Sequence, residues 1–517
     1  MRNKLRSWPG TEFVCRILCG CTLWIGCVSP VFAASYYVSN SGNDRNTGTA
    51  VSSPWQTLDK VNRFQFVPGD VIHFQRGGVW HGQLVPHSGS EKGHVTYTAY
   101  GDGAKPQILG SLEKNRVGDW EPVGENLWRA GPFPCDVGAI IFNNGQTWGS
   151  KVWDRLDVDA PRKFCYVPED KTVILYAKQN PATLFEDIEC ALTRHIISEG
   201  GKHYVIYDGL HLAYGSAHGI GGGGTHHIIV RNCDLSFIGG GHQYSKKTPR
   251  GVRHVRYGNG IEFWNGAHDN LVEHCRIWNI FDAGVTNQGS AKNAQYNITY
   301  RHNVIWNCSY SFEYWNRPAD SITHDIYFED NLCFNAGEGA CHGLGAHLMF
   351  FNNSAKTTRF FVRRNVFHNA KNSAIVMHLG GWNGLDELVL SDNLYVQPPD
   401  QTLIRWGDKS FTASQFAEYQ QFAGKDSDSR LVTVRNLALE PASINLRVGE
   451  TRQIEAVAVY SDGTSIKVPP VARFVSADPS VVDLEPFGLL RAKRPGKTVI
   501  TATFDGHSAV AAVLVGP

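Results

Sequence analysis

The sequence is poor in methionine and has no long apolar stretch beyond its first 34 residues. It contains 3 Met in 517 residues, and no later segment reaches the ~18 apolar residues that a membrane-spanning helix needs. None of the eight cysteines after residue 34 has CxxC spacing, which argues against a zinc site. The formal charge is only +1, so no strong excess of one sign marks the whole chain.

Glycine, by contrast, is abundant, with 53 residues, and the chain is rich in Asn and His. This mixture favours turns and short strands over long helices. At 19% charged and 42% hydrophobic residues, the composition is that of a folded, soluble protein with a large core. We therefore expect an all-β chain.

The N-terminal segment has the pattern of a secretory signal peptide. Basic residues precede the apolar run ILCGCTLWIGCV, and Val31 and Ala33 provide a cleavage pattern after Ala33. We therefore expect residues 1–33 to be a signal peptide and the protein to be secreted or periplasmic. An alternative is a lipid anchor, because LCG before Cys21 loosely resembles a lipid-attachment site.

From about residue 204 a hydrophobic alternation leads repeatedly to an Asn or Cys, and a second alternation follows. Successive spacings are 42, 28, 28, 34 and 28 residues along the series Cys233, Cys275, Asn303, Asn331, Asn365 and Asn393. A basic spacing of 28 with insertions is typical of a solenoid. We expect stacked coils of short strands about 4.8 Å apart, with an Asn at each corner bonding to the next coil. Cys233 and Cys275 either stack in the core or form a bridge.

This pattern resembles the right-handed parallel β-helix of the pectate-lyase-like superfamily, over roughly residues 35–430. Segment 36–74, which begins YYVSNSGNDRNTGT, is similar to the first turns and cap of such helices, with Asp44 and Asp59 in turns. FAEYQQFAGKDSDS (416–429) is similar to the helix and loop that seal the other end. The resemblance implies a β-helix over 34–432. Its members include lyases, hydrolases, epimerases and adhesins, so the fold alone does not identify the reaction.

The last segment, 433–517, has a different pattern. Strand-sized alternations separated by turn residues, as in VSADPSVVDLEPFGLLRAKRPGKTVITATFDG, predict a small β-sandwich. The segment resembles the second family of bacterial Ig-like domains, whose members are usually spacers or binding appendages. It contains no catalytic grouping.

A pentapeptide recurs in the solenoid as IEFWN (261–265) and FEYWN (312–316). If Ile261, Val285, Phe312 and Ile375 point inward, period-two geometry turns the next residue and the one two beyond it outward. The outward set is Glu262, Trp264, Thr286, Gln288, Glu313, Trp315, Val376 and His378. This places two glutamates and two tryptophans on one face, with the glutamate backbones two coils, or about 10 Å, apart.

Carboxylates about 6.5–9.5 Å apart suit inverting glycoside hydrolysis, so Glu262 and Glu313 are candidate catalytic residues. Asp282, at the turn before the middle strand, is a third candidate carboxylate. His342 and His378 are candidate proton carriers. Other readings remain open: outward glutamates are often only solubilising, and acidic side chains between coils can hold Ca²⁺.

Candidate substrate-binding residues surround these carboxylates. Trp264 and Trp315 offer faces for sugar rings, with Gln288 beside them, and Arg317 can bind a carboxylate through two parallel hydrogen bonds. An acid-free basic insertion, GGGHQYSKKTPRGVRHVRYGNG, runs directly into IEFWN and contains Lys246, Lys247, Arg250, Arg253 and Arg256. It is either a solvated loop or a binding wall for an anion. For an exported β-helix, an acidic polysaccharide fits better than nucleic acid.

These patterns predict a monomeric, secreted glycoside hydrolase that acts on an acidic polysaccharide and needs no cofactor for hydrolysis. A polysaccharide lyase or epimerase is the first alternative. Lyases of this fold commonly use Lys or Arg as base, and here Lys292 and Arg317 lie only in the following turns. A non-catalytic glycan-binding protein or adhesin is the second alternative.

Overall fold

The computed structural model describes residues 33–468 and 470–517. The predicted signal peptide, apart from Ala33, lies outside the described residues. Within the described part, no helix is long and apolar enough to cross a membrane.

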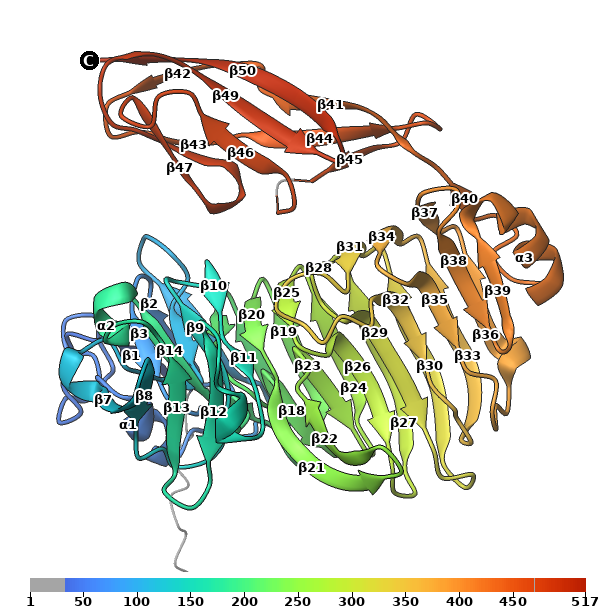
Figure 1. Ribbon diagram of the computed structural model, residues 1–517, viewed down its shortest axis with the longest axis horizontal. Helices are drawn as coiled ribbons and strands as arrows, with labels where there is room; N and C mark the ends of the chain where they lie inside the picture. Colours follow the sequence, from blue (N-terminus) through green and yellow to red (C-terminus); the bar gives the residue numbers. More distant parts are fainter. Residues whose placement is uncertain (1–32, 469) are drawn as a thin grey trace, which may run out of the picture. The chain divides into compact units, whose positions relative to one another are not determined.

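Three long sheets, in which all neighbouring strands but one pair run parallel, form a β-helix (Figure 1). Sheet 1 has the order β1 (Ser35–Val38), β2 (Val71–Gln75), β4 (Val95–Tyr100), β16 (His203–Asp208), β19 (His226–Arg231), β24 (His268–Glu273), β27 (Ala294–Arg301), β30 (Ile322–Glu329), β33 (Lys356–Arg363) and β36 (Leu388–Ser391). Sheet 2 has the order β3 (Val79–His81), β5 (Gln107–Leu109), β17 (His211–Ala213), β20 (Asp234–Ile238), β25 (Arg276–Ile280), β28 (Val304–Trp306), β31 (Leu332–Ala336), β34 (Val366–Ala370), β37 (Leu394–Val396) and β40 (Arg430–Leu431).

Sheet 3 carries the repeated pentapeptides. Its order is β15 (Ile197–Ser198), β18 (Ile220–Gly223), β23 (Ile261–Trp264), β26 (Ala283–Gly289), β29 (Tyr310–Asn316), β32 (Ala346–Phe350), β35 (Ser373–Met377), β38 (Thr402–Trp406) and β39 (Lys409–Thr412), of which only the last pair is antiparallel. The predicted all-β, parallel β-helical fold is confirmed.

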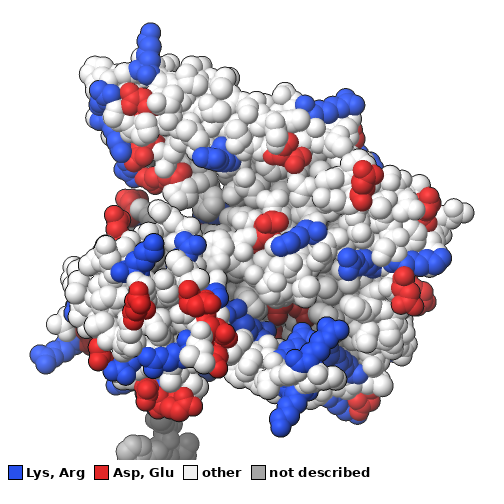
Figure 2. All heavy atoms as spheres, viewed as in Figure 1, with Lys and Arg blue, Asp and Glu red and all other residues white. Residues whose placement is uncertain are grey.

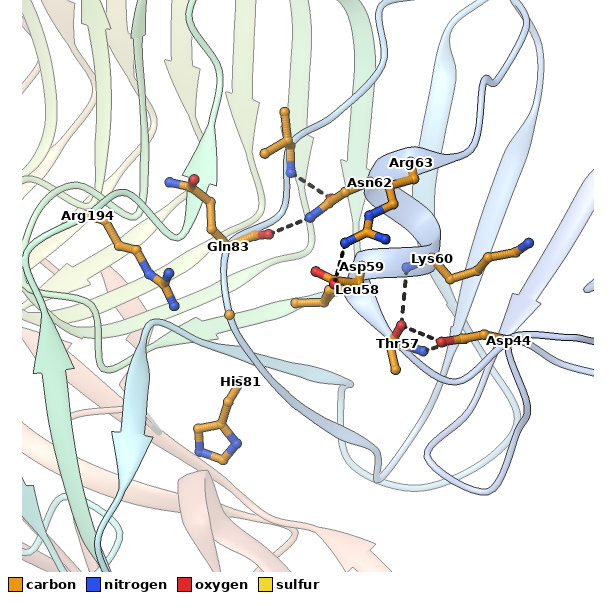
Figure 3. A pocket seen from close by; sticks show the side chains of 12 residues that line it. Asp44, Thr57, Leu58, Asp59, Lys60, Asn62, Arg63, His81, Gln83 and Arg194 are labelled. Carbon is orange, nitrogen blue, oxygen red and sulfur yellow. Dashed lines mark hydrogen bonds and ion pairs between the residues drawn. The ribbon is translucent and has the colours of Figure 1, made fainter. Parts of the chain in front are cut away.

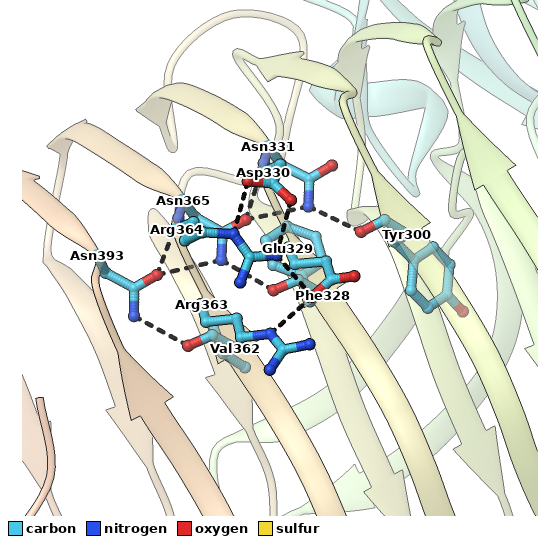
Figure 4. Close-up of polar contacts among 10 residues, drawn as sticks. All are labelled: Tyr300, Phe328, Glu329, Asp330, Asn331, Val362, Arg363, Arg364, Asn365 and Asn393. Carbon is cyan, nitrogen blue, oxygen red and sulfur yellow. Dashed lines mark hydrogen bonds and ion pairs between the residues drawn. The ribbon is translucent and has the colours of Figure 1, made fainter.

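The predicted asparagine corner is a continuous hydrogen-bonded ladder (Figure 4). Asn331 Oδ1 accepts from the backbone N–H and the side chain of Asn303, both at 3.0 Å. Asn365 accepts from Asn331 in the same way, at 2.9 and 3.1 Å, and Asn393 continues the series. The residue before each ladder position adopts a left-handed φ of 52–57°, as at Asp330. The ladder therefore satisfies backbone groups at a tight corner that strand pairing cannot reach.

The core of sheet 3 follows the predicted register. Ile261, Val285, Phe312 and Ile375 are fully buried and lie in one column through the paired strands, with Leu348 between the last two. Cys233 and Cys275 are also buried in this core, and the eight cysteines of the described residues are all unpaired. Of the two alternatives for Cys233 and Cys275, the structure therefore has packing rather than a bridge.

Two additions interrupt the coils. Residues 111–192 form two further sheets between β5 and β16. The first is antiparallel and consists of β10 (Thr147–Trp148), β9 (Val137–Phe142), β14 (Ile188–Leu192) and β6 (Ser111–Glu113). The second, in which only β11 and β12 pair in parallel, consists of β11 (Ser150–Lys151), β12 (Lys163–Val167), β13 (Thr172–Tyr176), β8 (Leu127–Ala130) and β7 (Glu121–Gly124). Short helices η1 (Val117–Asp119), η2 (Arg155–Asp157) and α2 (Pro181–Leu184) accompany them. The basic insertion is a hairpin of β21 (Gly241–Thr248) and β22 (Gly251–Tyr257).

The remaining elements lie near the chain ends. Helix α1 (Leu58–Arg63) follows β1, so Asp59 lies in its first turn and not in a loop turn as expected. Helices η3 (Leu385–Glu387), η4 (Ala413–Gln415) and α3 (Phe416–Ala423) accompany the last coils, and α3 matches the predicted closing helix.

The C-terminal strands pair only among themselves, in three small sheets. These are β41 (Val434–Glu440), β44 (Glu455–Tyr460) and β45 (Ser465–Lys467); β42 (Ser443–Arg447), β50 (His507–Gly516), β49 (Gly496–Phe504) and β46 (Arg473–Ser476); and β43 (Thr451–Gln453), β48 (Leu489–Ala492) and β47 (Val482–Glu485), with η5 (Pro486–Gly488) before β48. The assignment to a bacterial Ig-like family stays a prediction.

Candidate functional site

The outward faces of β23, β26 and β29 bring the two pentapeptides into register. Glu262 pairs across the sheet with Thr286 and then Glu313, while Trp264 pairs with Gln288 and then Trp315. The two glutamates are thus two strand spacings apart, or about 10 Å between backbones. The repeated motif therefore forms one surface and not two separate ones.

This surface is the floor of two adjoining cavities. One, of about 620 Å³, is lined by Glu262, Trp264, Asp282, Gln288, Glu313, Trp315 and Arg317. The other, of about 730 Å³, is lined among others by Arg253, Asp282, Glu313, His342 and His378. Asp282, Glu313 and Arg256 line both cavities. The structure therefore brings all five candidate catalytic residues to the walls of these two adjoining cavities.

Glu313 is held in an unusual environment for a carboxyl group. Its side chain is only 4% exposed, Oε1 accepts a hydrogen bond from Trp315 Nε1 at 3.0 Å, and Oε2 has no partner among the described residues. Burial and the negative charge of Asp282 raise the pKa of Glu313 well above its usual range. The Trp315 donor opposes this rise, Glu262 adds to it, and Arg317 opposes it. This environment therefore favours the protonated form of Glu313.

Glu262 is paired with a histidine that lies one coil away. Glu262 Oε2 lies 2.9 Å from His218 Nε2, and both side chains are nearly buried. His218 Nδ1 accepts the backbone N–H of Asn259 at 3.0 Å, so the network assigns the ring proton to Nε2, toward Glu262. The ring of His195 stacks on His218 at 4.9 Å, and burial lowers the pKa of His195 to about 4, so His195 is neutral.

Asp282 is paired in the same manner with His342. His342 Nε2 lies 3.2 Å from Asp282 Oδ1, and Nδ1 accepts the backbone N–H of Leu344 at 3.3 Å. Ser309 Oγ fixes the loop by accepting the backbone N–H of His342. His378, by contrast, stacks on Phe351 at 5.6 Å and makes no side-chain hydrogen bond among the described residues. It lines the cavity, but it is not part of either carboxylate–imidazole pair.

The two tryptophans of the pentapeptides lie against each other at the wall of the smaller cavity. Trp264 and Trp315 meet edge to face with ring centroids 5.3 Å apart. The guanidinium of Arg317 lies 4.0 Å from the ring of Trp315, which fixes its charge next to the cavity of Glu313. Gln288, between the two tryptophans, is 6% exposed. Flat apolar faces beside polar groups are the usual composition of a sugar-binding surface.

Only some of the basic residues of the hairpin β21–β22 lie at the site. Arg256 donates to the carbonyls of Gly240 and Gly138 at 2.6 and 2.8 Å, which fastens the hairpin base to the inserted antiparallel sheet. Arg253 lines the larger cavity. Lys246, Lys247 and Arg250 are exposed near the hairpin tip and line neither cavity. Figure 2 shows a cluster of Lys and Arg side chains where the hairpin lies in Figure 1.

Two site residues, His195 and His218, were not foreseen from the sequence. His218 lies two residues before β18, one coil ahead of IEFWN, and only the stacking of β18 on β23 brings it near Glu262. The one signal in the sequence was that His218 is a polar residue shortly before the inward strand residue Ile220. Among the residues that the structure describes, no group of three or more His, Cys, Asp or Glu is placed to hold a metal ion. A Ca²⁺ role stays a prediction.

No family model matches the chain. Curated relatives match over short stretches: an S-layer-related protein of Niallia circulans is 34% identical over 82 residues, covering 16% of this chain and 5% of the relative, and a lacto-N-biosidase of Bifidobacterium longum is 34% identical over 95 residues, covering 17% and 6%. The chain thus spans a small fraction of the curated relatives it matches.

Solved structures that match the chain include a glycoside hydrolase. It is 11% identical in sequence, the match covers 72% of this chain and 90% of the other, and the TM-score is 0.47. A family 28 exopolygalacturonase of Yersinia enterocolitica is 12% identical, with coverage of 75% and 69% and a TM-score of 0.37. A lacto-N-biosidase of Eubacterium ramulus is 13% identical, with coverage of 77% and 68% and a TM-score of 0.32. Because these identities and TM-scores are low, the fold is assigned from the strand pairing of this chain itself.

Proposed function

We propose that the protein is a secreted glycoside hydrolase that cleaves a polysaccharide in the cavity above β23, β26 and β29. The observation that supports this proposal is Glu313, a carboxyl whose pKa burial and the charge of Asp282 raise well above its usual range and which faces a cavity lined by two tryptophans. A surface glutamate present only for solubility would be exposed and ionised. Glu313 instead has an oxygen without a partner, which suits a group that gives up a proton during a reaction.

In the proposed reaction, Glu313 is the general acid and Glu262 the general base. Glu262 takes a proton from a water molecule while that water attacks the anomeric carbon. The glycosidic C–O bond breaks, and its oxygen takes the proton of Glu313. The spacing of about two strands between the glutamates leaves room for the water, so inversion at the anomeric carbon is expected.

The paired residues have supporting roles in this scheme. The Nε2–H of His218 fixes one oxygen of Glu262 and leaves the other for the water. Asp282, held by His342, adds its negative charge to the effect of burial and so helps to raise the pKa of Glu313. Arg317 and Arg253 favour a substrate that carries carboxylates, because planar guanidinium groups bind carboxylates through paired hydrogen bonds.

The test is Glu313→Gln, assayed on a panel of neutral and acidic polysaccharides. Glutamine keeps the shape of the side chain but has no proton to donate, so turnover should fall by about 10²–10⁴-fold. A matched control is Glu273→Gln, which removes a strand glutamate of sheet 1 that is paired with Arg301 outside the cavities. Glu273→Gln should retain activity. Near-normal turnover of Glu313→Gln would refute the assignment.

The same assay separates hydrolysis from the lyase alternative. New reducing ends without ultraviolet absorbance of unsaturated uronates indicate hydrolysis. Both signals together indicate β-elimination, for which Arg317 beside Glu313 would be the first residue to replace. Binding without either signal would indicate a glycan-binding protein.

A further inference from the structure

Another large cavity, of about 840 Å³, lies beside helix α1 and is lined by other residues (Figure 3). Asn62 of α1, His81 and Gln83 from the end of β3, and Arg194 from the segment before β15 all line it. None of these residues lines the cavities of Glu313. The proposed cleavage reaction therefore makes no use of this space.

Arg194 stands out because its guanidinium is unpaired. No hydrogen bond or ion pair joins it to another described side chain or carbonyl, and its Nε is enclosed without a partner. Figure 3 shows the guanidinium next to the cavity, across from α1. A shielded N–H donor that lacks an acceptor costs free energy, whereas a ligand that supplies an acceptor recovers it.

The acids of this cavity are already engaged. Asp44 accepts from Gln56 N–H, Thr57 N–H and Thr57 Oγ1 at 2.8, 3.0 and 2.7 Å. Asp59 pairs with Arg63 at 3.1 Å. Neither carboxylate neutralises Arg194, so its positive charge remains available.

The neighbouring histidine engages a further carboxylate, that of Glu189. His81 Nε2 lies 2.9 Å from Glu189 Oε1, and Ser111 donates to Glu189 Oε2 at 2.6 Å. The hydrogen bond to Glu189 raises the pKa of His81. Glu189 is thereby held by His81 and Ser111, and it too is not a partner of Arg194.

The walls around Arg194 are held in place before any ligand arrives. Asn62 bridges two residues of the segment after β3, donating to Gln83 O at 2.9 Å and accepting from Val85 N–H at 2.9 Å. Gln83 Nε2 donates to His195 O at 2.8 Å, which ties the segment of Arg194 to the same wall. Preorganised walls reduce the cost of binding.

We propose that this cavity is a second glycan site, in which Arg194 binds the carboxylate or sulfate of an anionic sugar. A planar guanidinium matches both groups, because each presents two oxygens to its two parallel N–H donors. The volume is within the range of sites that enclose a ligand of this size. The binding does not depend on cleavage at Glu313, so the protein holds an acidic glycan here whatever the reaction at the other site.

The test uses the full chain with the Glu313→Gln substitution, so that the result does not depend on a reaction at Glu313, and follows side-chain Nε–H signals of arginine by NMR. The Arg194 signal is assigned by its loss in Arg194→Gln. The probes are sodium D-galacturonate, N-acetylglucosamine 6-sulfate and, as the neutral control, galactose. The Arg194 signal should shift with the anionic sugars and not with galactose. A shift with one anion alone identifies the source as uronate or sulfated sugar.

Two further variants test whether binding needs the paired N–H donors of Arg194 and not only its positive charge, and whether another substitution in the cavity leaves binding intact. Arg194→Lys keeps the charge but not the paired donors and should weaken binding about tenfold, read from the backbone amide signal of Asn62. Arg63→Gln, whose arginine lines the cavity but is neutralised by Asp59, should bind within about twofold of the parent. The proposal is overturned if no anionic sugar moves the Arg194 signal, if galactose moves it equally, or if Arg194→Lys binds as well as the parent.

Discussion

Replacing Glu199 by glutamine should remove a pH-dependent loss of stability from the first coils of the helix. Glu199 directly follows β15, its backbone N–H donates to Gly221 O, and its side chain contacts the core residue Tyr207. It is 1% exposed, accepts a hydrogen bond from Tyr207 Oη, and has one oxygen without a partner among the described residues. Burial raises its pKa from 4.5 to about 7, while the Tyr207 hydrogen bond and the charge of Lys202 oppose the rise.

The sign and size of the effect follow from this shift. Below about pH 4.5 the carboxyl is protonated in both the folded and the unfolded chain, so its full contribution to stability is present. Between pH 4.5 and 7 the unfolded chain releases the proton while the folded chain retains it, so the free energy of unfolding falls as pH rises. At about 1.4 kcal/mol per pKa unit, the total fall is about 3 kcal/mol. Above pH 7 this contribution stays constant.

The measurement is the free energy of unfolding in urea at about pH 4 and about pH 8 for the parent and Glu199→Gln. Glutamine does not titrate, so the difference between the two proteins should change by about 3 kcal/mol between these pH values, in favour of the variant at the higher pH. The exposed Glu91 provides a control, because Glu91→Gln should leave the pH dependence unchanged. Parallel pH curves for the parent and Glu199→Gln would refute the reasoning.

Further predictions concern the charge on Glu313 and the corner ladder. Asp282→Asn removes a neighbouring negative charge, so the pKa of Glu313 and the alkaline limb of kcat/KM should move to lower pH; an unmoved limb would show that Glu313 is not the acid. Trp315→Phe removes the indole donor that stabilises the ionised carboxylate, so the same limb should move to higher pH, and a downward shift would contradict this. Asn331→Ala breaks the ladder and leaves buried N–H groups such as that of Asn303 without an acceptor, so urea unfolding should show a loss of about 2–3 kcal/mol; unchanged stability would mean that water replaces the side chain.

The sequence by itself determined the repeated coils of the β-helix, the register of their strands and which pentapeptide residues point outward. Strand alternation has a period of two, and the coils of a solenoid repeat one another, so the inward position of Ile261 fixes the outward position of Glu262 locally. The same reasoning placed Glu313 in register with Glu262, and the spacing of 28 placed Asn303 in the ladder. Such features need only short-range pattern and repetition, both of which are visible in one chain.

Only the tertiary structure determined the burial of those residues, their hydrogen-bond partners and their pKa values. The sequence placed Glu313 on the outward face of the coil but did not show that the side chain is buried there, and the raised pKa of Glu313 depends on that burial. His218 reaches Glu262, and His342 reaches Asp282, from loops whose lengths follow no repeat. The unpaired state of Arg194 depends on which acids other residues have already engaged. The burial of a side chain and the choice of its charged partners depend on residues that are far apart in the chain. No local sequence pattern therefore predicts them.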